Sequence, residues 1–255
     1  MKNKRIIVIL SFLLLFVAII ILCSNIFTLK KVNIKLDNIQ TISATTQTEI
    51  CTESCFKYNE NIFFINKTKI INYLEQKYPM LMIKDIETIF PNQLIIHAEE
   101  RVEVFYVKIS QNAFASFDQT FKCLNIYSTQ PSLTQVTGVN AENAVAGQWL
   151  EKNNNVNIST QTYSSFYLAY YDAQSFVNFL KRIEILNNNL LLVTKISGDI
   201  GLSISIENPN NNLTNKIIYA LSAYKSLSVD QKAHGTIELI ENLENSEKFI
   251  VTYKE

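Results

Sequence analysis

The strongest pattern of apolar positions lies near the amino terminus. Residues 6–23 contain one polar side chain, that of Ser11. At about 1.5 Å per residue, a helix over this run is roughly 27 Å long, and continuing it to Phe27 matches the hydrocarbon core of a bilayer, about 30 Å thick. The pattern therefore predicts a membrane-spanning helix over residues 6–28, with residues 1–5 as a short tail before it.

Basic residues on the two sides of this run predict its orientation. Lys2, Lys4 and Arg5 come directly before it, whereas Lys30 and Lys31 follow it after a short gap. Because segments with more lysine and arginine stay in the cytoplasm, we expect a cytoplasmic tail and a chain that folds outside the cytoplasm.

The alternative to a membrane anchor is a secretory signal that is cleaved off. Such a signal has a shorter apolar core and small residues at its exit. Residues 22–25 contain no Ala-x-Ala, and the bulky Leu22 before Cys23 does not suit a lipoprotein cleavage site. The sequence therefore favours the uncleaved anchor.

In residues 29–101 the apolar pattern becomes periodic. Val32, Ile34 and Leu36 alternate with polar residues, as in a half-buried strand. Helical spacing follows, and then two strands joined by a turn that contains Pro91. The predicted elements are strand 32–36, helices 45–56 and 70–78, and strands 83–89 and 94–99. This order predicts one compact domain in which the helices pack on one face of a three-stranded sheet.

Residues 102–255 are richer in predicted strands. Expected there are strands at 104–109, 113–117, 190–196, 202–206, 236–241 and 248–254, helices at 176–186 and 217–224, and an irregular span at 125–162. The whole chain is thus predicted to be α+β, with a membrane helix, a β-α-α-β-β domain and a larger β-rich α+β domain.

Charge and motifs exclude several classes of function. The 23 acidic residues balance the 23 basic ones, so the chain has no electrostatic footprint for nucleic acid. With five glycines it contains neither a phosphate-cradling loop nor a Gly-x-Ser-x-Gly motif. We therefore expect no enzymatic activity, no catalytic residue, no small-molecule substrate and no cofactor.

Cys51, Cys55 and His97 are the set that most suggests a metal site, because they fall in one predicted domain. Zinc sites favour ligand spacings and a fourth ligand that we do not find, so we expect no metal. Two cysteines one helical turn apart are more simply explained by packing on one helix face. The charged run 99–101 is interpreted as the end of a surface strand at the domain junction.

Several short motifs occur in a fixed order along the chain. They are Val32-x-Ile-x-Leu36, Asn61-Ile62-Phe63, Tyr78-Pro79, Phe90-Pro91-Asn92-Gln93-Leu94-Ile95-Ile96, Glu100-Arg101, Asp118, Pro131-x-Leu133 and Lys216. Together with the tail and the membrane helix, this series resembles the bacterial division proteins FtsQ and DivIB, whose first domain has the polypeptide-transport-associated (POTRA) fold. The resemblance implies a POTRA-like domain over residues 29–101 and an FtsQ/DivIB-like β domain over residues 102–255.

The last predicted strand, 248–254, is the candidate partner-binding site. A strand at the end of a chain often lies at a sheet edge, where its free backbone groups accept a strand of another protein. The alternative is that Phe249, Val251 and Tyr253 are only the buried face of this strand. The resemblance implies binding, through late strands, to FtsB/DivIC-like and FtsL-like single-pass division proteins. The candidate residues are Leu239, Phe249, Ile250, Val251, Thr252 and Tyr253.

These expectations combine into a hypothesis with two alternatives. The resemblance implies a non-enzymatic cell-division scaffold, a single-pass type II protein of the inner or plasma membrane that acts at the septum and helps to control septal peptidoglycan synthesis. The first alternative is a POTRA-containing adaptor for polypeptide transport or secretion. The second is an extracytoplasmic hydrolase or ligand receptor, which would require Cys51, Cys55 and His97 to converge on a metal.

Overall fold

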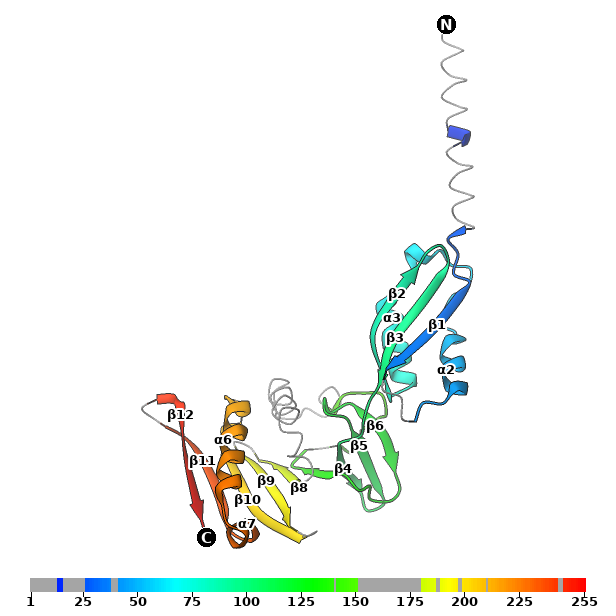
Figure 1. Cartoon of the computed structure of the whole chain (residues 1–255). Coiled ribbons are helices and arrows are strands. Elements are labelled where there is room, and N and C mark those ends of the chain that lie inside the picture. The colour runs from blue at the N-terminus through cyan, green and yellow to red at the C-terminus, as the bar shows by residue number, and fades with distance from the viewer. Residues whose placement is uncertain are drawn as a thin grey trace. The chain divides into compact units, whose positions relative to one another are not determined.

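The computed structural model describes residues 13–15, 26–37, 41–139, 141–150, 180–186, 189–196, 199–209, 211–242 and 245–255. The chain forms two compact units, unit 1 (residues 1–101) and unit 2 (residues 102–255). It is α+β and rich in strands, as predicted (Figure 1). Most of the predicted membrane segment, residues 6–28, lies outside the described residues. Within the described part of the chain, no helix is long and apolar enough to cross a membrane.

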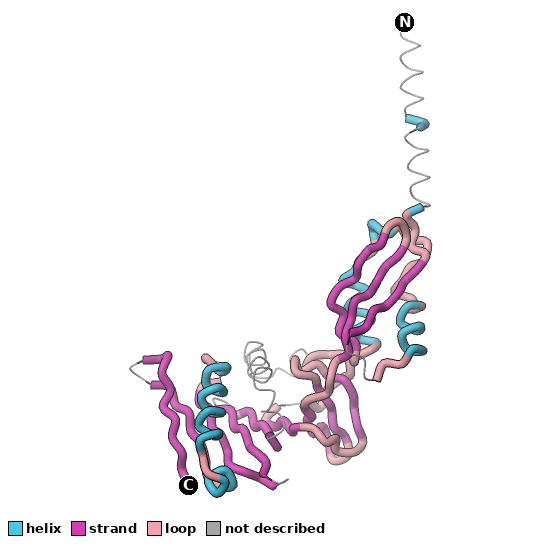
Figure 2. Tube along the Cα trace, in the orientation of Figure 1, coloured by secondary structure: helices cyan, strands magenta, loops and turns pink. Residues whose placement is uncertain are grey.

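Unit 1 contains the predicted order of strand, helix, helix, strand and strand. Its elements are β1 (Lys31–Asp37), α2 (Ala44–Cys51), the short 3-10 helix η1 (Ile62–Phe64), α3 (Lys67–Lys77), β2 (Leu81–Ile89) and β3 (Gln93–Glu100). β3 is the central strand, parallel to β1 and antiparallel to β2. α2 packs against β1 and α3 against β2, and Figure 2 shows the helices beside the sheet.

Alternation along β3 determines which face of this sheet is buried. Leu94, Ile96 and Ala98 are buried, while the residues between them are partly exposed. Successive side chains of a strand point to opposite faces, so these three share one face. Ile50 of α2 and Leu74 of α3 belong to the same buried cluster. The helices therefore cover the apolar face that the strand pattern predicts.

Short polar side chains begin the helices of this unit. The side chains of Ser43 and Asn66 accept hydrogen bonds from backbone N–H groups in the first turns of α2 and α3, at 3.1 and 3.0 Å. Such caps satisfy N–H groups that have no partner within the helix. α2 is shorter than the predicted helix 45–56, because it ends at Cys51 and the chain continues in turns.

The charged run 99–101 is not simply the surface strand end that the sequence suggested. Glu100 and Arg101 are both buried. An Arg101 guanidinium nitrogen lies 3.2 Å from a Glu75 carboxylate oxygen, and Glu100 accepts a hydrogen bond from the backbone N–H of Thr41 at 2.8 Å. The surface interpretation was wrong for these two residues, because the fold supplies each with a partner distant in sequence.

Unit 2 is built on a nine-stranded sheet. Its elements are β4 (Phe105–Ser110), β5 (Ala113–Phe117), β6 (Cys123–Tyr127), β7 (Thr134–Thr137), β8 (Leu180–Ile185), β9 (Asn189–Ile196), β10 (Asp199–Glu207), α6 (Leu213–Ser226), α7 (Val229–Ala233), β11 (Thr236–Asn242) and β12 (Asn245–Lys254). The strands lie in the order β12-β11-β10-β9-β8-β7-β4-β5-β6. Neighbouring pairs are antiparallel except β4 with β7, β7 with β8 and β10 with β11.

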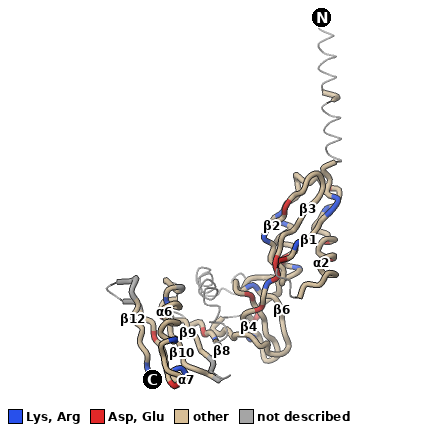
Figure 3. Tube along the Cα trace, viewed as in Figure 1, with Lys and Arg blue, Asp and Glu red and all other residues tan. Residues whose placement is uncertain are grey.

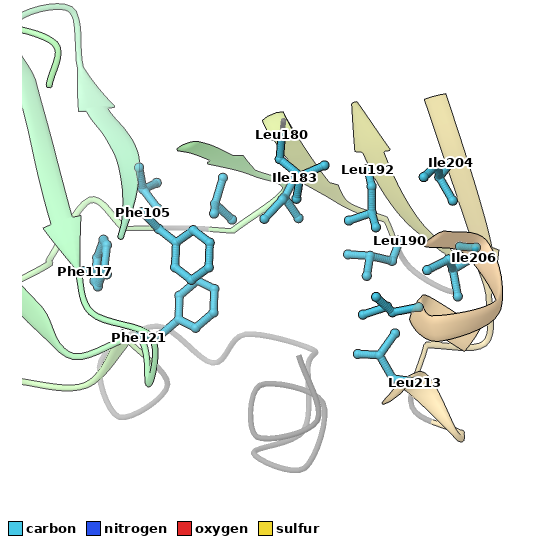
Figure 4. Close-up of a cluster of buried hydrophobic side chains, with 14 of the residues drawn as sticks. Phe105, Phe117, Phe121, Leu180, Ile183, Leu190, Leu192, Ile204, Ile206 and Leu213 are labelled. Carbon is cyan, nitrogen blue, oxygen red and sulfur yellow. The ribbon is translucent and has the colours of Figure 1, made fainter. Parts of the chain in front are cut away.

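A single apolar cluster runs along this sheet (Figure 4). Near its β4 end, the rings of Phe105 and Phe121 stack with their centres 5.1 Å apart. Near the other end, Leu192 and Ile206 of the sheet gather with Leu213 of α6. α6 thus closes the core over β10 and β11 and reaches the terminal strand β12.

Two predictions for unit 2 were wrong in part. The span 125–162 was expected to be irregular, yet most of β6 lies at its start and β7 within it. The stripe 176–186 was expected to be a helix, yet Leu180–Ile185 form β8, and residues 176–179 lie outside the described residues. β8 has a bulge opposite β9, so that Leu180 and Ile183, three residues apart, are both buried. An extra residue in a strand thus produces the spacing of a helical face.

Candidate functional site

The candidate site lies at one edge of the nine-stranded sheet. Among the described strands, β12 pairs with β11 alone. In this antiparallel pair, Ile250 stands opposite Ile240 and Val251 opposite Leu239. An edge strand presents backbone N–H and C=O groups that its own sheet does not use. The edge position on which the partner-binding hypothesis depends is therefore present.

The two faces of β12 differ in what covers them. On the α6 side, Phe249 and Tyr253 are partly buried, but Val251 remains 37% exposed. On the other side, Ile250 is 50% exposed and Thr252 is also exposed. The alternative of a simple buried face therefore describes Phe249 and Tyr253 but not Val251, and both faces offer side chains that another chain could contact.

Leu239 differs from the other candidate residues. It lies on β11, one strand in from the edge, and it is 1% exposed within the core of unit 2. A side chain in that position cannot meet a partner directly. We therefore assign Leu239 to the packing beneath β12 rather than to the contact surface.

Lys216 in the first turn of α6 connects the helix to the end of β10 and to β12. It is fully buried, and its ammonium group donates hydrogen bonds to the carbonyl oxygens of Glu207 and Asn208, at 2.8 and 2.9 Å. The same group lies 5.8 Å from the centre of the Phe249 ring, and Tyr219 contacts that ring from the next turn of the helix. A charge is tolerated here because carbonyl oxygens and an aromatic face replace its water.

The carboxyl end of β12 packs closely against the start of β11. Gly235 has φ of +87°, and a Cβ atom there would lie 2.4 Å from the carbonyl oxygen of Lys254. The hydroxyl group of Tyr253 donates to the carbonyl oxygen of His234 at 3.3 Å. Lys254 also forms an ion pair with Glu238, at 2.6 Å. β12 is thus held at Phe249 in its middle and at its carboxyl end, which leaves a stable edge.

The possible metal ligands Cys51, Cys55 and His97 do not form a metal-binding group in the described residues, where no three His, Cys, Asp or Glu residues cluster in that way. His97 instead contacts Glu87, with 3.0 Å between the ring nitrogen Nε2 and the carboxylate. Burial raises the pKa of the Cys51 thiol, and burial with the nearby charge of Glu53 raises that of Cys55 to about 11. Burial at both positions therefore favours the neutral thiol over the thiolate.

The chain also contains a polar cluster that the sequence did not predict. Glu53, between the two cysteines, is buried and contacts the ammonium group of Lys77 at 2.7 Å. The hydroxyl groups of Tyr73 and Tyr78 donate to the same carboxylate at 3.0 and 2.5 Å. The hydrogen bond from Lys77, followed by that from Tyr78, lowers the pKa of Glu53.

One part of this cluster was visible in the sequence. Tyr73 and Lys77 are four residues apart, which places them on one face of a helix. Nothing local indicated that Glu53, some 20 residues earlier, would meet that face. Each polar group of the cluster has a hydrogen-bond or ion-pair partner within it. We therefore interpret the cluster as a structural contact that holds the α2–η1 loop against α3, not as a reactive centre.

Comparison with known proteins identifies no family for this chain. The sequence matches no protein-family model. No curated protein matches it either.

Proposed function

We propose that this protein is a membrane-anchored, non-enzymatic scaffold of bacterial cell division, similar in plan to FtsQ and DivIB. In this proposal, residues 6–28 anchor it in the inner or plasma membrane with the amino terminus in the cytoplasm. Residues 29–101 are a POTRA-like domain that docks at the septal assembly, and residues 102–255 are the β domain that binds partners.

The observation that carries the proposal is the exposed edge strand β12. Its backbone can extend the sheet by one strand, and Ile250, Val251 and Thr252 present side chains on its two faces. Proteins usually protect such an edge when it has no partner, because an open edge promotes aggregation. The partners expected from the resemblance are FtsB/DivIC-like and FtsL-like proteins, and their capture would help to control septal peptidoglycan synthesis.

The arrangement of unit 1 also supports the proposal. The strand order β1-β3-β2, with two helices before the β2–β3 hairpin, is the β-α-α-β-β arrangement expected of a POTRA-like domain. The same arrangement is compatible with the alternative, an adaptor that guides exported polypeptides. Such an adaptor would bind many unrelated chains, whereas a division scaffold binds a few defined ones.

Site-specific photo-crosslinking in the native host tests the proposal. A benzophenone amino acid replaces Ile250 in the full-length chain, and a matched control places it at Ile126, which is also exposed but lies on the opposite edge strand, β6. We expect position 250, and not 126, to crosslink to small single-pass coiled-coil proteins. Crosslinks to many unrelated exported chains would support the transport adaptor instead.

A depletion strain provides the second test. Loss of the protein should produce filamentous cells that fail to complete septa. Cells that divide normally without the protein would contradict the division scaffold, whatever the crosslinking shows.

A further inference from the structure

Unit 1 has an exposed aromatic patch that the proposed function does not use. It consists of Phe63 and Phe64 of η1, Phe90 of the β2–β3 turn, and Ile26 and Phe27 before β1. Phe63, Phe64 and Phe90 are 61%, 77% and 60% exposed. The rings of Phe27, Phe63 and Phe90 lie with their centres 5.3 to 6.1 Å apart, so they form one contiguous surface.

Local geometry turns these rings outward. The side chain of Asn61 accepts a hydrogen bond from the backbone N–H of Phe63 at 3.0 Å and so caps the single turn of η1. That turn buries Ile62, which is 4% exposed, and thereby directs Phe63 and Phe64 to the outside. The exposure therefore follows from an ordered, capped turn.

Backbone hydrogen bonds hold the three segments of the patch together. The N–H of Ile62 donates to the carbonyl oxygen of Phe27 at 2.9 Å, and the N–H of Leu29 donates to that of Glu60 at 2.9 Å. The N–H of Lys30 donates to the carbonyl oxygen of Asn92, next to the Phe90 turn, at 2.9 Å. The patch is thus a preformed platform, and exposed apolar surfaces of this kind mark interaction sites.

The chain itself indicates what covers the patch. The apolar run of residues 6–23 is followed, after Ser24 and Asn25, by Ile26 and Phe27, which are part of the patch. If that run spans the bilayer, as the proposed function requires, the patch lies where the chain leaves the hydrocarbon core. Phenylalanine on an amphipathic surface partitions into the boundary between headgroups and acyl chains.

Charge around the patch fits the same surface. The three segments that form it, residues 26–31, 57–67 and 89–93, contain four lysines and one glutamate. Lys30 and Lys31 are exposed, and Figure 3 shows a basic segment at the start of β1. Lysines beside an apolar surface are attracted to anionic headgroups.

From these observations we infer that unit 1 rests on the bilayer through Phe63, Phe64 and Phe90, which insert into its interfacial layer. The contact restricts the orientation of unit 1 relative to the bilayer. Attachment through both the anchor and the patch defines that orientation, whereas attachment through the anchor alone does not. The inference depends on the membrane anchoring in the proposed function, and the test below separates the two.

The test uses the full-length chain in vesicles of phosphatidylcholine and phosphatidylglycerol that contain brominated lipid, a short-range quencher of tryptophan. Trp149, the one tryptophan of the chain, is replaced by Phe, and a tryptophan is introduced by Phe64→Trp. The matched control is Gln76→Trp, exposed near the other end of α3 in the same unit. Circular dichroism verifies that all variants fold, and resistance to alkaline extraction verifies insertion.

We expect tryptophan at position 64 to be quenched by brominated lipid and shifted to the blue, and tryptophan at position 76 to show neither change. An inserted chain in which the two positions behave alike would overturn the inference and leave the anchor intact. Protection of position 64 from aqueous quenchers without quenching by lipid would overturn it in favour of a protein partner or a second copy. A chain that alkaline extraction removes would overturn both the anchor and the inference.

Discussion

The ammonium group of Lys216 lies 5.8 Å from the centre of the Phe249 ring. Through this contact and its bonds to the end of β10, one buried lysine connects a helix, a central strand and the exposed edge strand. The position of the candidate binding edge therefore depends on a residue that no partner would touch.

Replacement of Lys216 by Met should destabilise unit 2. The carbonyl oxygens of Glu207 and Asn208 would lose a buried donor, at a cost of about 1–3 kcal/mol in the free energy of unfolding. Urea unfolding followed by Trp149 fluorescence measures the change. Lys225→Met, on an exposed position of the same helix, is the control and should stay within about 0.5 kcal/mol of the wild type. Equal stability of the two variants would contradict the proposed role of Lys216.

Replacement of Gly235 by Ala should loosen β12 at its carboxyl end. A Cβ atom would lie 2.4 Å from the carbonyl oxygen of Lys254, on a backbone with positive φ, which together cost about 1–3 kcal/mol. Thermal unfolding measures the cost, and crosslinking from position 250 measures the state of the edge.

Gly138→Ala is the matched control for this prediction. Its Cβ would meet the backbone of Ile185, so it should destabilise the same unit, but at the β7–β8 part of the sheet. We expect only Gly235→Ala to weaken crosslinking at a temperature where both variants are folded. Equal loss in both would indicate that general instability, not the edge, determines capture.

Replacement of Arg101 by Met should strongly destabilise unit 1. Arg101 and Glu75 form a buried ion pair at 3.2 Å, and removing one member of such a pair costs about 3–5 kcal/mol because a buried charge is left behind. Labelling of the half-buried Cys55 thiol as a function of urea reports on this unit. Glu87→Gln removes the exposed contact with His97 and should cost at most about 1 kcal/mol. A small effect of Arg101→Met on the free energy of unfolding would contradict the stabilising role of this ion pair.

Acid should destabilise unit 1 partly through Glu53. Since the folded-state pKa of Glu53 is lowered, its stabilisation is present above the ordinary glutamate pKa of 4.5 and is lost as the pH falls through the folded value. The urea concentration at the midpoint of wild-type unfolding, followed by circular dichroism, should therefore be lower at about pH 3 than at about pH 6. The decrease should be smaller for Glu53→Gln. The exposed Glu49 is the control, and Glu49→Gln should retain the wild-type slope.

Several features of the fold could be predicted from local sequence. The alternation in β3 and the helical spacing in α3 each occur within one element, and the physical cause, burial of one face, acts at that same range. Pro79 indicated where the second helix ends, and α3 ends at Lys77. The order of elements in unit 1 followed from these signals together.

Other features could not be predicted because a distant segment determines them. The bulge in β8 depends on pairing with β9, and without that information the apolar positions of β8 have helical spacing. β7 is only four residues long and gains its stability from β4 and β8. Burial of Glu100 and Arg101 likewise required Thr41 and Glu75, which lie far away in sequence.

The candidate site shows the same division. The alternating pattern of residues 248–254 was enough to predict a strand, but only the sheet order places β12 at an edge and Leu239 beneath it. Likewise, the aromatic patch joins Phe27, Phe63 and Phe90 from three separate segments. For elements such as β3, α3 and β12, the sequence by itself determined whether a segment forms a helix or a strand, because burial periodicity is local. Only the tertiary structure decided which edges, charges and rings are exposed, because that depends on which segments pack together.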